Sequence, residues 1–200
     1  MNNDFADMDF KSREYWEERY SQGGNSGAGS YGHLAEFKAE VINGFIEQHE
    51  IKNVIEWGCG DGNQLGLFRC EEYIGYDVSE TAIEICCKKY SHDSKKKFIH
   101  YLGDRVAVCR KADMALSLDV IYHLIEDEVF DIYMHNLFES TNRYVCIYSS
   151  NEDRRTALHV KRRRFTEYVA DKFPEWELME MIRQRYPEDT RSDFYFYSLK

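Results

Sequence analysis

The residues with the clearest chemical potential are a glycine-rich stretch and an acidic residue downstream of it. Residues 56–62 read Glu-Trp-Gly-Cys-Gly-Asp-Gly and follow a short apolar run. Glycines let the backbone turn sharply and approach a ligand with no Cβ atom in the way. Asp77 comes about twenty residues after Gly58, where an acidic side chain can accept hydrogen bonds from both hydroxyls of a ribose. Together these residues predict a site for a ligand that contains a nucleoside.

The spacing of the glycines separates two kinds of nucleoside ligand. The dinucleotide fingerprint G-x-G-x-x-G would need its third glycine at position 63, which is Asn63. The sequence instead reads acidic-x-G-x-G-x-G, with Glu56 at the end of the apolar run. A dinucleotide brings a pyrophosphate to a helix N-terminus, whereas an adenosyl amino acid brings a zwitterion and a sulfonium that suit a nearby acid. The pattern favours a methyl-donor site, with an NAD(P)-dependent oxidoreductase as the alternative.

Alternating apolar and amphipathic segments must position these residues. Strands are expected at residues 54–56, 73–77, 98–102, 114–118 and 144–148. Helices are expected at residues 34–49, 63–69, 80–89, 126–138 and 166–173. Strands that alternate with helices predict an α/β fold with a doubly wound, mainly parallel sheet that helices cover on both faces. Residues 176–182 and 194–198 have the pattern of a closing antiparallel pair.

The chain is expected to form one domain, residues 1–200, with an N-terminal segment that closes on the core at residues 34–200. Residues 1–33 hold a helix with Tyr15, Trp16, Arg19 and Tyr20 at helical spacing, followed by a glycine- and serine-rich stretch. Such a stretch can be a flexible tail. The amphipathic helices on either side of it, and Tyr31 within it, favour a lid that folds over a ligand.

Composition and charge argue against several classes of protein. The formal net charge is -10, and the longest basic run is the one at residues 161–164, so no nucleic-acid partner is expected. None of the six cysteines forms a CxxC pair and no histidine lies at zinc-finger spacing, so no metal site is expected. The N-terminus is polar and no apolar run approaches the roughly 20 residues that cross a bilayer. A cytoplasmic protein with neither a signal peptide nor membrane contact is expected.

Four short motifs resemble those of class I S-adenosylmethionine-dependent methyltransferases. Residues 54–63 (VIEWGCGDGN) look like the first signature of that family, and residues 76–79 (YDVS) resemble the second. Gly103-Asp104 is similar to the third, and residues 113–124 (DMALSLDVIYHL) resemble the fourth strand and its exit. The resemblance covers about residues 52–149 by motif and the whole chain by element order. It implies a Rossmann-like, seven-stranded sheet with an antiparallel last strand. It also implies S-adenosyl-L-methionine as cofactor and S-adenosyl-L-homocysteine as product.

The motifs and the resemblance together place donor contacts along much of the chain. These positions are Arg19, Tyr20, Glu56, Gly58, Gly60, Gly62, Asp77, Val78, Asp104, Arg105, Leu118 and Asp119. The resemblance implies that the glycines pass beneath the amino-acid end of the donor and that Asp77 and Val78 hold the ribose and adenine. It puts Asp104 at the adenine amino group, beside Arg105. Arg19 resembles a lid residue that closes on the donor carboxylate, and a surface salt bridge is its alternative role.

Methyl transfer needs a base only if the accepting atom must lose a proton. His123, just beyond the fourth expected strand, is the candidate base, with packing against the next helix as its alternative role. Tyr122 is expected either to line the acceptor pocket or to lie in the core. The chain lacks an NPPY-like or DPPY-like tetrad there, which argues against amino methylation of nucleic-acid bases.

The residues after the fifth expected strand are candidates for acceptor binding. The link at residues 149–164 contains His159, Lys161, Arg162 and Arg164. It could form a cationic cleft for a carboxylated or phosphorylated molecule, or its charges could simply be solvated. A small-molecule acceptor with an O or N nucleophile, anionic or sugar-type, is the expected substrate. A non-catalytic subunit that binds the donor stays a second alternative, and both a monomer and a homodimer remain open.

Overall fold

The sheet places the carboxyl ends of its five parallel strands at one edge. The structure, a computed structural model, describes residues 10–200. The strands are β1 (Asn53–Trp57), β2 (Glu72–Asp77), β3 (Lys96–His100), β4 (Ala112–Leu118), β5 (Thr141–Ser149), β8 (Trp176–Ile182) and β9 (Asp193–Leu199). They lie in the order β3-β2-β1-β4-β5-β9-β8. Strands β1 to β5 are parallel, and β9 runs antiparallel to both of its neighbours. The predicted mainly parallel, seven-stranded sheet with an antiparallel last strand is confirmed.

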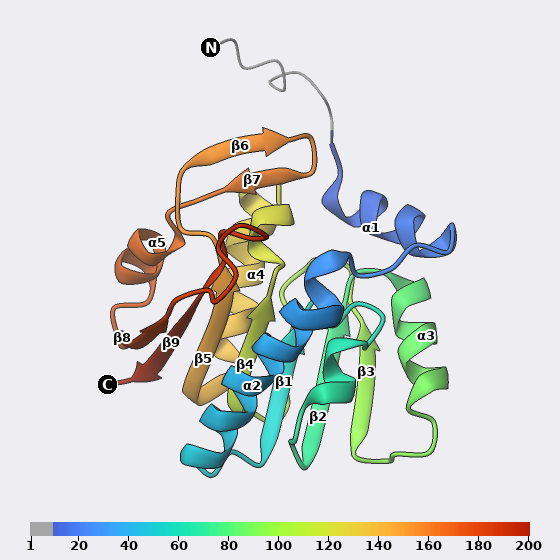
Figure 1. Ribbon diagram of the computed structural model, residues 1–200, viewed down its shortest axis with the longest axis horizontal. Helices are drawn as coiled ribbons and strands as arrows, with labels where there is room; N and C mark the ends of the chain where they lie inside the picture. Colours follow the sequence, from blue (N-terminus) through green and yellow to red (C-terminus); the bar gives the residue numbers. More distant parts are fainter. Residues whose placement is uncertain (1–9) are drawn as a thin grey trace.

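Helices cover both faces of this sheet because its central strands are apolar on both sides. The helices are α1 (Ser12–Ser21), α2 (Gly32–Gln48), α3 (Glu80–Lys89), α4 (Asp127–Glu139) and α5 (Phe165–Lys172). Alternate residues of β1 face opposite ways, since Val54 packs with α2 and α3 whereas Ile55 and Trp57 pack with α4 and α5. Two cores therefore sandwich the sheet (Figure 1).

Two segments differ from the expected elements. Residues 63–69 form no α-helix but a short 3-10 turn, Gln64–Leu67, because Gly66 weakens a helix and Phe68 is already extended. The expected link at residues 149–164 contains a hairpin of β6 (Arg154–Ala157) and β7 (Val160–Arg162). The hairpin adds a second wall above the C-terminal edge of the sheet, beside α1 (Figure 1).

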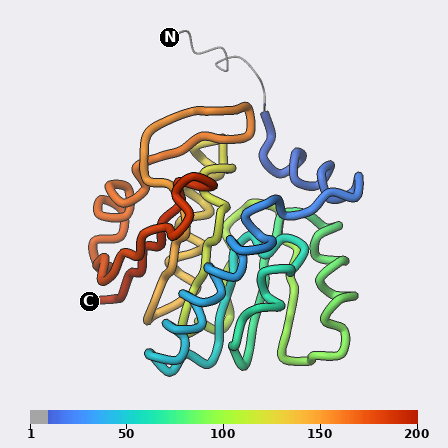
Figure 2. The backbone as a smooth tube through the Cα atoms, viewed as in Figure 1, coloured from blue at the N-terminus to red at the C-terminus, as the bar shows by residue number. Residues whose placement is uncertain are grey.

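The N-terminal segment lies across that same edge. Helix α1 and the loop after it run over the ends of β1 and β2 before the chain enters α2, as the backbone tube shows (Figure 2). Residues 1–9 of the predicted lid segment lie outside the described residues. Among the helices of residues 10–200, none combines the length and the apolar character that a membrane span requires. The edge of the sheet is thus roofed by α1 on one side and by the hairpin on the other.

Candidate active site

The glycine-rich turn after β1 has a backbone that glycine alone adopts easily. Gly58, Gly60 and Gly62 have φ angles of 80°, 55° and 67°. A Cβ atom on Gly60 would lie 2.3 Å from Ser26 Oγ and 2.7 Å from Tyr20 Oη. The N-terminal segment therefore rests directly on the turn, and position 60 leaves no room for a side chain.

Asp77 ends β2 and ties this turn to the neighbouring strand. Its Oδ2 accepts a hydrogen bond from Gly60 N at 2.9 Å, and its Oδ1 accepts one from Ser79 N at 2.9 Å. Burial raises the pKa of the Asp77 carboxyl to about 6, because the charged form loses contact with water. Each carboxylate oxygen can accept a second hydrogen bond. The side chain is fixed in place and still has free lone pairs.

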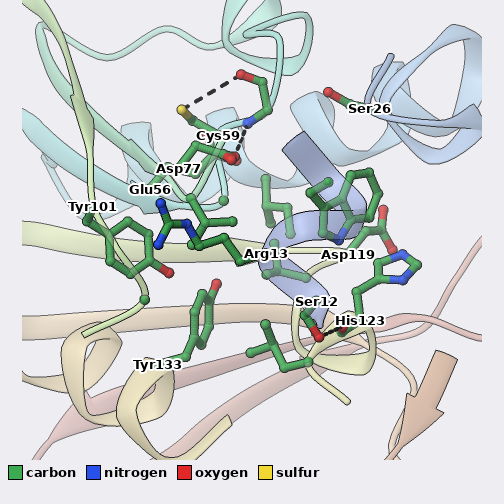
Figure 3. A pocket seen from close by; sticks show the side chains of 18 of the residues that line it. Ser12, Arg13, Ser26, Glu56, Cys59, Asp77, Tyr101, Asp119, His123 and Tyr133 are labelled. Carbon is green, nitrogen blue, oxygen red and sulfur yellow. Dashed lines mark hydrogen bonds between the residues drawn. The ribbon is translucent and has the colours of Figure 1, made fainter. Parts of the chain in front are cut away.

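A cavity of about 140 Å³ opens where the ends of β1, β2 and β4 meet the N-terminal segment. Most of the predicted site residues line it, namely Tyr20, Glu56, Gly58, Gly60, Asp77, Val78, Leu118, Asp119 and His123. Figure 3 shows the side chain of Arg13, from α1, extending across this cavity toward Tyr101. The sequence motifs and the N-terminal segment thus converge on one space.

Glu56 is a buried acid in the wall of this cavity. Its side chain accepts a hydrogen bond from the hydroxyl of Tyr73, and the residue is only 3% exposed. Burial raises the pKa of the Glu56 carboxyl to about 7, although the hydrogen bond from Tyr73 and the charge of Lys38 act in the opposite direction. Glu56 therefore changes its charge near neutral pH.

Asp119 follows β4 in a left-handed backbone conformation, with φ at 60°. Its Oδ2 accepts a hydrogen bond from Lys38 Nζ at 2.8 Å, and the Lys38 side chain is 1% exposed. Its Oδ1 accepts hydrogen bonds from Tyr122 Oη at 2.9 Å and from Ser192 Oγ at 3.2 Å. A positive φ strains the backbone of a non-glycine residue. The three hydrogen bonds of the side chain stabilise Asp119 in this conformation.

Hydrogen bonds tie both ends of the N-terminal segment to the core. Ser12 Oγ donates to His123 O at 2.9 Å, and Glu17 accepts bonds from the hydroxyls of Ser79 and Thr81 at 2.7 and 2.6 Å. In the loop after α1, Ser26 N donates to Asp61 Oδ2 at 3.0 Å, and the Tyr31 hydroxyl donates to the same atom at 2.7 Å. The predicted lid is an ordered roof over the cavity.

His123 is held in one tautomer beside this roof. Its Nδ1 lies 2.8 Å from the carbonyl oxygen of His159, and a carbonyl can only accept, so Nδ1 carries the proton. The lone pair is then on Nε2. Burial lowers the pKa of His123 to about 4, so the ring is neutral at physiological pH. A neutral imidazole with a free lone pair can accept a proton.

Two other predicted site residues, His159 and Tyr122, are not among the residues that line the cavity. His159, at the tip of the hairpin, stacks between the rings of Tyr15 at 5.1 Å and His123 at 5.7 Å. Tyr122 faces a second cleft on the other side of Asp119. Both nevertheless contact the ring of His123, with ring centroids 4.5 Å away for Tyr122 and 5.7 Å away for His159.

Asp104 and Arg105, predicted at the adenine, also lie away from the cavity. Both residues are exposed. Arg105 Nη2 bonds both carboxylate oxygens of Glu139, at 2.6 and 2.7 Å, and is drawn toward α4. The residues of this segment that do line the cavity are Tyr101, Leu102 and Gly103. This part of the cavity wall is mainly apolar, and a contact of Asp104 or Arg105 with an adenine stays a prediction.

Gly62 and Arg19 have structural roles. A Cβ atom on Gly62 would lie 2.9 Å from Cys86 Sγ, so this glycine lets the turn pack against α3. Arg19 Nε donates to Asn25 O at 2.7 Å, and its guanidinium lies 5.5 Å from the ring centre of Trp16. Arg19 therefore shapes the loop and is not part of the cavity wall.

Each of the four basic side chains at residues 161–164 has an acidic partner. Lys161 and Arg163 both pair with Asp127, at 2.6 and 2.7 Å. Arg162 pairs with Glu152 at 3.0 Å, and Arg164 lies 3.5 Å from Asp153. Lys161 and Arg163 share one carboxylate, so three carboxylates partly offset the four charges, and a cationic acceptor site at this link stays a prediction.

The cavity also contains polar residues that the sequence did not single out. They are Ser12, Arg13, Ser26, Ser30, Lys38 and Gln64. Gln64 is buried, and its Oε1 has no hydrogen-bond partner among residues 10–200, whereas its Nε2 donates to Ala35 O at 3.0 Å. An orphaned acceptor in a cavity wall marks a position where a ligand can donate a hydrogen bond. The described residues hold no cluster of three or more side chains suited to a metal ion.

Solved structures of methyltransferases share this architecture. The N-methyltransferase NodS from Bradyrhizobium japonicum, in complex with S-adenosyl-L-homocysteine, has a TM-score of 0.74 at 11% identity over 95% of this chain and 99% of that chain. The magnesium protoporphyrin IX methyltransferase ChlM from Synechocystis, with bound S-adenosylmethionine, has a TM-score of 0.67 at 13% identity, over 96% and 98%. The methyltransferase domain of a bacterial Hen1 has a TM-score of 0.63 at 19% identity, over 81% and 97%.

No protein-family model matches the sequence, and a search of curated proteins finds no match. The similarity to these structures is therefore one of fold, namely the order of the strands, the antiparallel β9 and the position of the glycine-rich turn. On these features, the chain has the fold of the class I S-adenosylmethionine-dependent methyltransferases.

Proposed function

We propose that the protein is an S-adenosylmethionine-dependent methyltransferase that acts on a small-molecule acceptor. One observation carries the proposal. The glycine-rich turn, the fixed carboxylate of Asp77 and the orphaned Oε1 of Gln64 all border the same cavity at the C-terminal edge of β1 and β2. Ligands of open α/β sheets bind at this edge.

These side chains fit the two ends of an adenosyl amino acid. The free lone pairs of Asp77 can accept the two ribose hydroxyls while its existing bonds keep it in place. Gln64 Oε1 can accept a hydrogen bond from the ammonium of the amino-acid end. Lys38 donates one of its three N–H groups to Asp119 and can donate another to the carboxylate at the amino-acid end of the ligand. When bound, S-adenosylmethionine supplies an activated methyl group.

The remaining chemistry is the removal of a proton from the acceptor. His123 borders the cavity as a neutral ring with its lone pair on Nε2, so it can take that proton. A pKa of about 4 makes it a weak base, which suits an acceptor that loses its proton late in the reaction. The hairpin acts on His123 through the backbone carbonyl of His159, so His159 is a positioning residue.

The alternative of an NAD(P)-dependent oxidoreductase is less well supported. Asn63 occupies the place of the third glycine and donates from its side chain to Ser30 O at 2.7 Å. It thus fastens the loop after α1, where a dinucleotide fold would bring a helix N-terminus close to a pyrophosphate. A non-catalytic subunit that binds the donor would share the same cavity, and only turnover distinguishes it.

Binding of S-adenosylhomocysteine tests the proposal directly. We expect it to raise the melting temperature, and we expect NADH to leave it unchanged. Asp77→Asn should weaken S-adenosylhomocysteine binding by about 10- to 100-fold, the usual cost of losing hydrogen bonds to a charged group. Asp93→Asn is the matched control, since Asp93 also accepts a bond from the backbone two residues later, at Lys95 N, but lies away from the cavity.

Two outcomes would contradict the proposal. Stabilisation by NADH but not by S-adenosylhomocysteine would favour the oxidoreductase. Equal S-adenosylhomocysteine affinity in the wild type and in Asp77→Asn would remove Asp77 from the site. Production of S-adenosylhomocysteine from S-adenosylmethionine in a mixture of small metabolites then separates an enzyme from a non-catalytic subunit.

A further inference from the structure

A second cleft of about 500 Å³ lies between the β6–β7 hairpin and residues 187–192. Ser150, the residue directly after β5, lines it, and so does Tyr122, whose hydroxyl bonds to Asp119 in the wall of the first cavity. The fold places it at the same edge of the sheet as the proposed donor site. Nothing in the proposed function so far uses this cleft.

One side chain separates the two spaces. Asp119 lines the first cavity, and its Oδ1 accepts hydrogen bonds from Tyr122 and Ser192, which both line the second cleft. A ligand hydroxyl that enters from the second cleft can replace Ser192 as a donor to Asp119, since the bond from Ser192 is the longer one at 3.2 Å. The cleft therefore leads to the place where a donor and an acceptor would meet.

The wall of the cleft contains a buried hydroxyl with no partner. Ser150 is 2% exposed, and its Oγ makes no hydrogen bond to any of residues 10–200. A buried polar group without a partner destabilises a protein, so such groups are rare and call for an explanation. A bound molecule that exchanges a hydrogen bond with Ser150 provides one.

The chemistry of the remaining lining indicates the class of that molecule. Five of the lining residues carry hydroxyls, namely Tyr122, Ser150, Thr156, Thr190 and Ser192. The charged lining residues are two arginines, Arg162 and Arg191, and two acids, Glu188 and Asp189. Arg162 is further offset by Glu152, at 3.0 Å. The cleft has no net charge that would select an anion or a cation, but it offers many groups that both donate and accept.

We propose that this cleft binds the acceptor and that the acceptor is a polyhydroxylated ring, a sugar or a cyclitol. Such a ring presents hydroxyls in several directions, and each can donate and accept as the lining hydroxyls do. Its apolar face can lie on the ring of Tyr122, as sugars lie on aromatic side chains. One hydroxyl then reaches Asp119. This inference rests on the proposed function, because it is the donor cavity that makes the second cleft an acceptor site.

Binding measurements on the full-length protein saturated with S-adenosylhomocysteine test the inference. The probes are myo-inositol and methyl α-D-glucopyranoside as neutral polyols, with glucose 6-phosphate and spermidine as an anion and a cation. Saturation-transfer NMR should detect both polyols, and the phosphate group of glucose 6-phosphate should add no affinity. Ser150→Ala should weaken polyol binding by about tenfold. Ser94→Ala, at an exposed serine away from both spaces, is the matched control.

The melting temperature of the ligand-free variants gives a second readout. Ser150→Ala removes a buried hydroxyl that has no partner, so it should raise the melting temperature while it weakens polyol binding. A purely structural serine would show a lower melting temperature and no effect on binding, and that result would overturn the inference. Absence of binding by both polyols, or binding only of glucose 6-phosphate or spermidine, would also overturn it. Failure of S-adenosylhomocysteine itself to bind would instead refute the proposed function.

Discussion

Replacing Glu56 by glutamine should make the stability of the protein less dependent on pH. Glu56 is buried, and its pKa is raised from 4.5 to about 7. The native protein therefore binds this proton more tightly than the unfolded chain does, and stability falls as pH rises between those two values. Glutamine keeps an oxygen that can accept the hydrogen bond from Tyr73 but cannot ionise. The variant should therefore lack the part of the fall in stability with rising pH that the ionisation of Glu56 causes.

The size of the effect follows from the shift. Each pKa unit corresponds to about 1.4 kcal/mol, so a shift of roughly two and a half units corresponds to about 3 kcal/mol. At pH values below the unfolded pKa, the Glu56 carboxyl is protonated in both the native and the unfolded chain. The free energies of unfolding of the wild type and the variant should therefore differ little there. Above about pH 7 the wild type carries the full cost of a buried charge, so Glu56→Gln should be more stable there by about 3 kcal/mol.

Urea denaturation at about pH 5 and about pH 8, followed by tryptophan fluorescence, measures the difference. Glu72→Gln is the control, because Glu72 lies at the exposed start of β2 and, within residues 10–200, forms its salt bridge with the exposed side chain of Arg110 at 3.2 Å. Its effect should be the same at both pH values. An equal effect of Glu56→Gln at both pH values would show that Glu56 ionises as an exposed carboxyl does, and the reasoning from burial would be refuted.

Two further substitutions and one NMR measurement test the geometry around the cavity. Lys38→Met should destabilise the protein by about 3–5 kcal/mol in urea denaturation, because it leaves the Asp119 carboxylate without its buried partner; a loss below about 1 kcal/mol would contradict this. Gly60→Ala should abolish S-adenosylhomocysteine binding in calorimetry by displacing the lid, whereas Gly44→Ala, with open space around its Cβ, should bind normally and gain up to about 1 kcal/mol. Long-range ¹H–¹⁵N NMR should show His123 protonated at Nδ1 and not titrating above about pH 5; titration near 6.5 would mean that the ring is solvated.

Local sequence signals predicted the fold and the floor of the site well. Strand ends, glycines with positive φ and an acid at the end of β2 are properties of short segments, and the chain order alone brings them to one edge of a parallel sheet. The glycines at positions 58 and 60 and Asp77 line the cavity for this reason. For these residues, the spacing along the sequence is enough to predict that they lie close together in space.

The walls of the site depend on contacts between distant segments, which no local pattern encodes. Lys38 lies between Glu36 and Glu40 in the sequence of α2 and looks like a solvent-facing residue, yet Asp119, 81 positions away, makes its burial possible. Arg105 follows a motif residue but is drawn outward by Glu139 on α4. The hairpin was missed because its strands are short and polar, and the lining of the second cleft comes from four separate segments.

The order of the loop after α1 has a consequence for affinity. A glycine- and serine-rich loop that became ordered only on binding would lose much conformational entropy at that moment, and the affinity for the ligand would be reduced accordingly. Here Asp61 and Asn63 already hold the loop through hydrogen bonds to Ser26, Tyr31 and Ser30. The loop therefore loses this conformational entropy when the protein folds, before a ligand binds. The loop is preorganised, and contacts that it makes with a ligand contribute almost fully to binding.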